Sequence, residues 1–218
     1  MRALVCKEYG PPESLVIQEQ DDPVPGDAEI LVDIKAAGIN FPDVLAIAGK
    51  YQVKTPTPFV PGNEAAGVVA GIGPGVSRYA IGDRVIVNPQ GGAFAEKCVA
   101  NVHRCAPLPA DLSFEQGAGF SVTYGTSYHA LKQSADLQPG ETVLVLGAAG
   151  GVGITAVEIA KTMGATVIAA ASSQEKLDFA RSAGADQTIN YSEAPLKETV
   201  KELTEGKGVD VVYDPVGG

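Results

Sequence analysis

A glycine-rich turn is the segment of this sequence whose residue types and spacing most clearly allow chemistry. It reads G-A-A-G-G-V-G over residues 147–153, and it joins an apolar run, Thr142–Leu146, to a helical pattern. Glycine permits a sharp turn and a close approach of backbone amides to an anion, and a helix N-terminus adds unpaired N–H groups and partial positive charge. The turn fits G-x-G-x-x-G except that Ala148 occupies the first glycine position. It predicts a pyrophosphate site, the alternative being a plain loop of small residues. The binding residues would be Gly150, Gly151 and Val152.

The end of the next expected strand, Thr166–Ala171, indicates which dinucleotide would bind. NAD sites usually place Asp or Glu there to bind the ribose hydroxyls. Here Ser172, Ser173 and Lys176 follow the strand, with no acid at its tip. Two hydroxyls at a helix N-terminus and a lysine suit a 2′-phosphate, so we expect NADPH. The alternative is that Ser172 and Glu175 only form a capping box and that Lys176 is a solvated charge.

The elements that must position these residues alternate from Glu141 onward. Strands are expected at 142–146, 166–171, 187–190 and 209–213, with helices at 154–163, 177–183 and 192–205. This β-α-β-α-β-α-β order predicts an α/β fold with a doubly wound parallel sheet. A complete dinucleotide-binding sheet usually has about six strands, so we expect this domain to be truncated at its C-terminus. A small natural four-stranded sheet is the alternative.

The first half of the chain differs, because short strand patterns there alternate with Pro and Gly clusters. These strands are expected at 3–6, 15–19, 29–37, 67–71, 84–88 and 95–100. Their spacing suggests a barrel-like or sandwich module. The pattern changes near Leu112, where Ser113 and Gln116 have capping-box spacing, and a further helix is expected over 126–135. We therefore expect one domain over residues 1–120 and a second over residues 121–218.

Composition excludes several classes of protein. The 218 residues include 16 basic and 26 acidic ones, a net charge of −10 that repels phosphate backbones and argues against nucleic acid as a partner. The N-terminus does not resemble a signal peptide, and the apolar stretch 142–160 is better explained as a buried strand, turn and helix than as a membrane span. Cys6, Cys98 and Cys105 have no C-x-x-C spacing, so neither a disulfide framework nor a Cys-rich zinc site is expected. A cytoplasmic protein is the expectation.

Four segments together resemble a known family. They are Asn40-Phe41-Pro42-Asp43 leading to Gly49-Lys50-Tyr51, the run P-G-N-E-A-A-G-V-V over 61–69, G-D-R-V over 82–85 and A-A-G-G-V-G over 148–153. In order and spacing they resemble the medium-chain dehydrogenase/reductase superfamily, and within it the zinc-independent, zeta-crystallin-like quinone oxidoreductases. The resemblance implies a GroES-like β-barrel-type domain, then a Rossmann domain, with the active site in the cleft between them. In this family the turn usually begins with alanine, and the chain continues further and returns to the first domain.

The resemblance also bears on metals. Zinc alcohol dehydrogenases of this superfamily hold catalytic zinc with a Cys where this chain has Asn40 and a His where it has Asn63. Neither amide binds Zn²⁺ well. His103 and His129, the two histidines, match no ligand spacing. We therefore expect no metal, and reduction of an electron-poor acceptor rather than direct oxidation of an alcohol.

The resemblance assigns roles to single residues. It directs Asn40 at the nicotinamide end of the cofactor or at the acceptor, and Tyr51 could donate a hydrogen bond or proton to the acceptor's oxygen. It places Thr126 near the nicotinamide carboxamide, and Tyr191 with Lys176 around the 2′-phosphate. The alternatives are a turn residue for Asn40, an aromatic packing the wall for Tyr51 and a helix N-cap for Thr126.

The expected function is therefore NADPH-dependent transfer of hydride to a quinone or an α,β-unsaturated carbonyl, without zinc. Reduction of an enoyl thioester or alkenal is the alternative substrate assignment, and an NADPH-binding structural or sensor protein is the non-enzyme alternative. The partner is a small-molecule electron acceptor, and the full-length protein would form a homodimer. Residues 1–218 alone are expected to have weak activity or none, because the sheet is unfinished.

Overall fold

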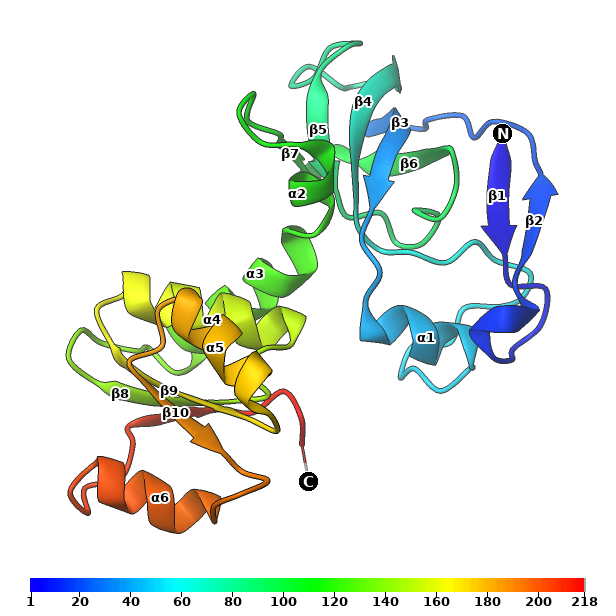
Figure 1. Ribbon diagram of the computed structural model, residues 1–218. Helices are drawn as coiled ribbons and strands as arrows, with labels where there is room; N and C mark the ends of the chain where they lie inside the picture. Colours follow the sequence, from blue (N-terminus) through cyan, green and yellow to red (C-terminus); the bar gives the residue numbers. More distant parts are fainter. Residues whose placement is uncertain (218) are drawn as a thin grey trace. The chain divides into compact units, whose positions relative to one another are not determined.

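The computed structural model describes residues 1–217. The chain divides into two compact units, Met1–Ser121 and a second that begins at Val122. The first is mainly β-structure and the second is an α/β layered unit (Figure 1).

The first unit is built on a five-stranded antiparallel sheet. Its strand order is β6-β3-β4-β5-β7. The bounds are β3 (Glu29–Ala37), β4 (Ala65–Ile72), β5 (Arg84–Val87), β6 (Lys97–Asn101) and β7 (Cys105–Pro107). Although β6 and β7 are at opposite ends of this order, Cys98 and Cys105 belong to one apolar core, which also includes Ile30, Val69 and Val85. The sheet therefore curls around its core, in agreement with the expected barrel-like module.

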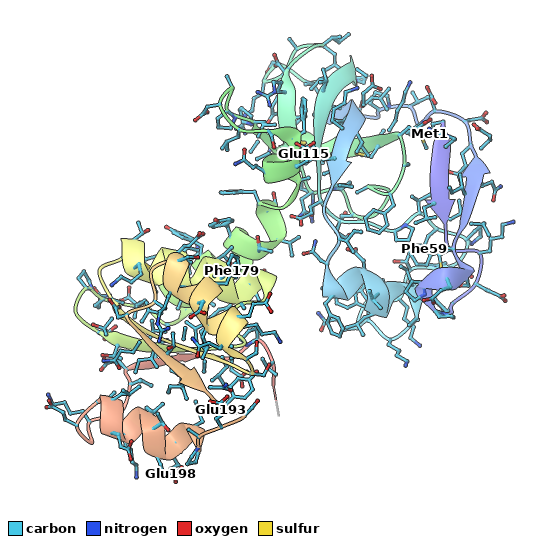
Figure 2. All side chains as sticks on the ribbon, viewed as in Figure 1. Met1, Phe59, Glu115, Phe179, Glu193 and Glu198 are labelled. Atoms are coloured by element: carbon cyan, nitrogen blue, oxygen red, sulfur yellow. The ribbon has the colours of Figure 1, made fainter. Side chains whose placement is uncertain are left out.

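A two-stranded ribbon and short helices complete the first unit. The ribbon pairs β1 (Arg2–Val5) with β2 (Val16–Glu19), which are separated by the short helix η1 (Pro12–Ser14). Single bridges join Ala3 to Ala95 and Cys6 to Phe59, the residue labelled beside the ribbon in Figure 2. The helices are α1 (Phe41–Ile47), α2 (Phe114–Ala118) and η2 (Val102–Arg104). Helix α2 covers β3 and β4 with Ala118 and begins at the predicted cap, Ser113.

The second unit is a four-stranded parallel sheet in the order β10-β9-β8-β11. The strands are β8 (Thr142–Leu146), β9 (Thr166–Ala171), β10 (Gln187–Asn190) and β11 (Val211–Tyr213). Helices α4 (Gly151–Thr162) and α5 (Gln174–Ser182) lie on one face of the sheet, and α6 (Leu196–Leu203) lies on the other (Figure 1). This is the predicted doubly wound arrangement.

Successive side chains of the central strands β8 and β9 point alternately to the two faces of the sheet and are buried on both. Val143, Val145 and Val167 pack with α4 residues in one core cluster. Leu144 and Ile168 pack with Val200 of α6 in another. In Figure 2, Phe179 of α5 and Glu198 of α6 are accordingly on opposite sides of the sheet. A parallel strand covered on both faces must be apolar throughout, which explains the continuous runs T-V-L-V-L and T-V-I-A-A-A.

Several helix boundaries differ from the sequence predictions. The helix expected over 126–135 begins earlier, as α3 (Ser121–Tyr128), and continues as a π-helical segment, η3 (His129–Ser134). The helix expected from Ser192 begins at Leu196, after a turn and Pro195. Helix α1 was not predicted, because seven residues with a proline in the first turn show little helical periodicity. Over residues 1–217, no helix is both long and apolar enough to cross a membrane.

Candidate functional site

The glycine turn between β8 and α4 has the geometry of an anion cradle. Gly147 has φ = +56°, and the Gly150 N–H donates to the Gly147 carbonyl at 2.9 Å. The N–H of Ala148 donates to Ala170 of β9 at 3.1 Å, which ties the turn to the sheet. Gly150 is the N-cap of α4, and the first N–H groups of a helix have no partner within it. These amides could therefore receive a pyrophosphate.

Gly153 shows that this turn requires glycine. A Cβ atom at this position would lie 2.3 Å from the Gly147 carbonyl oxygen and 2.9 Å from the Ala148 Cα. Both neighbours are backbone atoms and cannot move aside cheaply. The third glycine of the motif therefore allows the helix to pack directly against the turn, as the dinucleotide fingerprint requires.

The residues predicted to bind a 2′-phosphate come together at the carboxyl ends of β9 and β10. The Lys176 ammonium donates to the Ser172 hydroxyl at 3.1 Å. The backbone N–H of Tyr191 donates to Ala171 at 3.2 Å, which brings Tyr191 beside the end of β9. The Tyr191 side chain is 42% exposed, and Lys176 is exposed, so both can contact a ligand. Since β8, β9 and β10 are neighbours in a parallel sheet, this group and the glycine turn both lie at the carboxyl end of that sheet.

The N-cap of α5 is Ser173, whose hydroxyl accepts the Lys176 N–H at 3.5 Å. The predicted capping box between Ser172 and Glu175 is therefore wrong by one residue. Because Ser173 caps the helix, the Ser172 hydroxyl is left to contact the Lys176 ammonium. Both serine oxygens therefore accept a hydrogen bond from Lys176, and each hydroxyl keeps its O–H to donate to a phosphate.

Thr126 lies within α3 and is exposed. Because it lies inside the helix, the alternative that it serves as an N-cap is wrong. Helix α3 crosses the beginning of α4: the Thr155 hydroxyl donates to the Thr123 carbonyl at 3.2 Å. A buried network in the same region, which the sequence did not reveal, joins the Ser127 hydroxyl to Thr155 at 2.9 Å and to Tyr213 at 3.1 Å. These bonds fix α3, and with it Thr126, relative to α4 and β11.

In the first unit, Asn40 is held by two carboxylates. It is the N-cap of α1, and its backbone N–H donates to Asp43 Oδ2 at 2.8 Å. Its side-chain Nδ2 donates to Glu64 Oε1 at 2.8 Å. Asn63 Nδ2 donates to the other oxygen of Asp43 at 3.0 Å. Asn40 and Asn63 are thus each paired with an acid; the N-x-x-D spacing of Asn40 and Asp43 is the sequence signal for the first of these contacts.

Tyr51 lies at the other end of α1 from Asn40. Its backbone N–H donates to the Leu45 carbonyl at 3.1 Å, and its side chain is partly exposed. Asn40 directly precedes the first residue of α1, whereas Tyr51 follows the last, Ile47, by four positions. The hydrogen bonds of Asn40 go to Asp43 and Glu64 and do not link it to Tyr51.

The comparisons with known proteins agree with this geometry. Residues 26–131 match the alcohol dehydrogenase GroES-like domain, and residues 151–218 match the zinc-binding dehydrogenase family. The chain belongs to the medium-chain dehydrogenase/reductase superfamily, in its quinone oxidoreductase branch. The resemblance drawn from the sequence motifs is thus confirmed, as is the pairing of a GroES-like domain with a Rossmann-type parallel sheet.

Three relatives illustrate this membership of the superfamily. A quinone oxidoreductase-like protein 2 homolog of Nematostella vectensis is 42% identical over the whole of this chain and 60% of its own length. A probable oxidoreductase from Mycobacterium abscessus is 41% identical with a TM-score of 0.93, and the match covers all of this chain and 69% of that one. The Escherichia coli quinone oxidoreductase complexed with NADPH is 39% identical with a TM-score of 0.94, covering 100% and 67% of the two chains. The chain spans about 60% of the length of the curated relatives it matches.

Zinc does not fit the residues that replace the superfamily's metal ligands. Asn40 and Asn63 direct amide N–H groups at Glu64 and Asp43, so these carboxylates already accept hydrogen bonds. In the part of the chain that the structure describes, no group of three or more His, Cys, Asp or Glu side chains could hold a metal ion. His103 and His129 are both exposed, and His129 Nδ1 is 2.6 Å from Gln133 Oε1.

Proposed function

We propose that this protein is an NADPH-dependent oxidoreductase that reduces a quinone or an α,β-unsaturated carbonyl without zinc. The proposal rests on what lies at the carboxyl end of the parallel sheet. There the glycine turn that follows β8 is next to the polar group that follows β9 and β10, which consists of Ser172, Lys176 and Tyr191. This end of the sheet offers backbone amides for the pyrophosphate of NADPH and a lysine for its 2′-phosphate. A similar protein, the Escherichia coli quinone oxidoreductase, is described as complexed with NADPH.

Each residue has one part in the proposed reaction. When bound, NADPH supplies a hydride to an electron-poor atom of the acceptor. Gly151 and Val152 bind the pyrophosphate through their N–H groups. Gly150, whose own N–H donates to Gly147 within the turn, lets the pyrophosphate approach the backbone, and Thr126 binds the carboxamide end. Asn40 donates a hydrogen bond to the acceptor or to the nicotinamide group, and Tyr51 or water supplies the proton. Positioning accounts for most of the catalysis in such a scheme, because the cofactor carries the difficult chemistry.

The cofactor is tested by titrating the protein with NADPH and with NADH, using the fluorescence of the reduced nicotinamide. We expect NADPH to bind more tightly. Lys176→Ala should weaken NADPH binding about tenfold, the effect of losing one charge-assisted contact to phosphate, and leave NADH unchanged. Lys197→Ala, on the exposed side of α6, is the matched control and should change neither affinity. Equal loss for both cofactors would contradict the phosphate assignment.

The acceptor is tested on the full-length protein by offering quinones, enones, alkenals and enoyl thioesters separately and following NADPH consumption. Turnover of quinones or enones supports the proposal, and preferential turnover of enoyl thioesters or alkenals would replace its substrate. NADPH binding without turnover of any acceptor would favour a structural or sensing role. Homodimerisation of the full-length protein stays a prediction, to be measured by light scattering.

A further inference from the structure

Two buried carboxylates of the first unit have no part in the proposed reaction. Asp43 and Glu64 are each 1% exposed. Burying a carboxylate is costly unless hydrogen bonds replace its hydration, so the groups that bind these acids indicate what the acids do. In both cases one of the partners is Asn40, the residue proposed to contact the reacting groups.

Glu64 occupies a position that the fold keeps open for its carboxylate. A Cβ atom on Gly38 would lie 2.3 Å from Glu64 Oε1 and 2.5 Å from the Ala118 carbonyl oxygen, so only glycine fits at residue 38. The N–H of Gly38 also donates to the Glu64 carbonyl at 3.1 Å, which ties together the segments that carry Asn40 and Glu64. The same Oε1 atom accepts the Asn40 Nδ2 hydrogen bond.

Asp43 fixes the backbone at the same place. Its two oxygens accept from the Asn40 backbone N–H and from the Asn63 side chain. Burial raises the pKa of Asp43, and these two hydrogen bonds offset only part of the increase. The carboxylate therefore joins the start of α1 to the segment that precedes β4, while Glu64 holds the side chain of Asn40.

We propose that Glu64 is a positioning residue that fixes the orientation of the Asn40 amide; this inference rests on the proposed function. An asparagine amide can turn over and exchange its oxygen and nitrogen. Against Glu64 only one orientation is favourable, because turning it over would place the amide oxygen against a carboxylate oxygen. Nδ2 therefore points at Glu64, one of its two hydrogens is used there, and the second remains for a ligand. Asn40 is thereby a hydrogen-bond donor in a fixed direction, which suits an oxygen that gains negative charge.

A double-mutant cycle in the full chain tests whether Glu64 acts through Asn40. We expect Glu64→Ala and Asn40→Ala each to lower kcat/KM about tenfold, chiefly through kcat. In the Asn40→Ala background, Glu64→Ala should change kcat/KM by less than about twofold. Glu64→Gln keeps an acceptor oxygen and should retain activity within about threefold of the wild type. Glu198→Ala on α6 is the control variant, and its kcat/KM should equal that of the wild type. Equal loss in both backgrounds would overturn the proposal, because Glu64 would then act independently of Asn40.

A second readout does not depend on turnover. The side-chain amide resonances of Asn40 are identified in a ¹⁵N–¹H spectrum as the pair missing from Asn40→Ala. Glu64→Ala should shift them by more than any other side-chain amide pair and speed their hydrogen exchange, while Glu64→Gln should shift them less. If Glu64→Ala does not fold, the Glu64→Gln spectrum decides the matter. Unchanged Asn40 resonances in the decisive variant would overturn the positioning role. Absence of turnover in the wild type would instead contradict the proposed function and leave this measurement valid.

Discussion

At the scale of single residues, the site depends on which hydrogen bonds each polar side chain already makes within the protein. Ser172 and Ser173 are neighbours of the same type, yet Ser173 caps α5 and Ser172 faces the Lys176 ammonium. The sequence predicts a hydroxyl-rich helix start but not which serine caps it, because the choice depends on where β9 ends relative to α5. The same limit applies to Asn40: its spacing from Asp43 was visible, whereas its bond to Glu64, 24 residues away, required the structure.

Gly153 offers the sharpest residue-scale test of the turn. We expect Gly153→Ala to destabilise the second unit by about 2 kcal/mol or more, because its Cβ would overlap backbone atoms of Gly147 and Ala148. NADPH binding should weaken as well, since relieving this overlap moves the turn. Urea unfolding and the NADPH titration measure the two effects. Gly125→Ala is the control: its Cβ would meet no atom within 4 Å, and alanine favours a helix. If Gly153→Ala were as stable as Gly125→Ala, the close packing of turn and helix would be wrong.

At the scale of elements, the parallel sheet was predicted more accurately than anything else in the chain. Strands β8, β9 and β10 have the bounds that the sequence indicated. For β8 and β9 the reason is that strands buried on both faces are nearly continuous apolar runs bounded by turns. Strand β10 is a half-polar edge strand, and only the turns on either side of it mark its bounds. Helix α1 and strand β7 were missed for the opposite reason: seven and three residues are too short for a periodic pattern. The missed helix matters, because it carries Asn40 and Asp43 at its start.

An ion pair joins α4 to the segment that leads into β10. Lys161 Nζ lies 2.8 Å and 2.9 Å from the two oxygens of Asp186, and the Val167 N–H donates to Asp186 at 2.7 Å. Burial raises the pKa of Asp186, but these donors outweigh it and hold the pKa below its ordinary value of 3.8. Because the folded pKa is depressed, the stabilisation is present above pH 3.8 and is lost as the pH falls through the folded pKa.

We therefore expect Asp186→Asn to lower the free energy of unfolding of the second unit by about 1 kcal/mol at pH 7, with a smaller difference below about pH 4. Urea unfolding at several pH values measures this. Asp178→Asn is the matched control, because Asp178 pairs with Arg181 at 3.2 Å on an exposed surface and should contribute about 0.3 kcal/mol or less. A difference for Asp186→Asn that did not narrow in acid would contradict the assigned charge.

At the scale of the whole molecule, the cysteines distinguish the two units. Cys6, Cys98 and Cys105 are all buried and all lie in the first unit. Burial raises the pKa of Cys98 to about 12 and that of Cys105 to about 11, and it raises the pKa of Cys6 as well. Alkylation requires a thiolate, so these thiols should be inert while the unit is folded. The expected boundary at residue 120 already assigned all three cysteines to the first unit, whereas their burial required the structure.

Thiol labelling therefore reports the opening of the first unit alone. We expect iodoacetamide at pH 8 to modify Cys98 and Cys105 at least about a thousandfold more slowly than in the urea-unfolded chain, because modification requires opening of the core. Cys98 in β6 and Cys105 in β7 lie at opposite ends of the strand order but in one core cluster. A curled sheet that opens as one unit exposes both at once, so mass spectrometry of the peptides should give equal protection factors. Fast labelling of Cys105 alone would mean that β7 detaches separately, and the two edges would then not share a core.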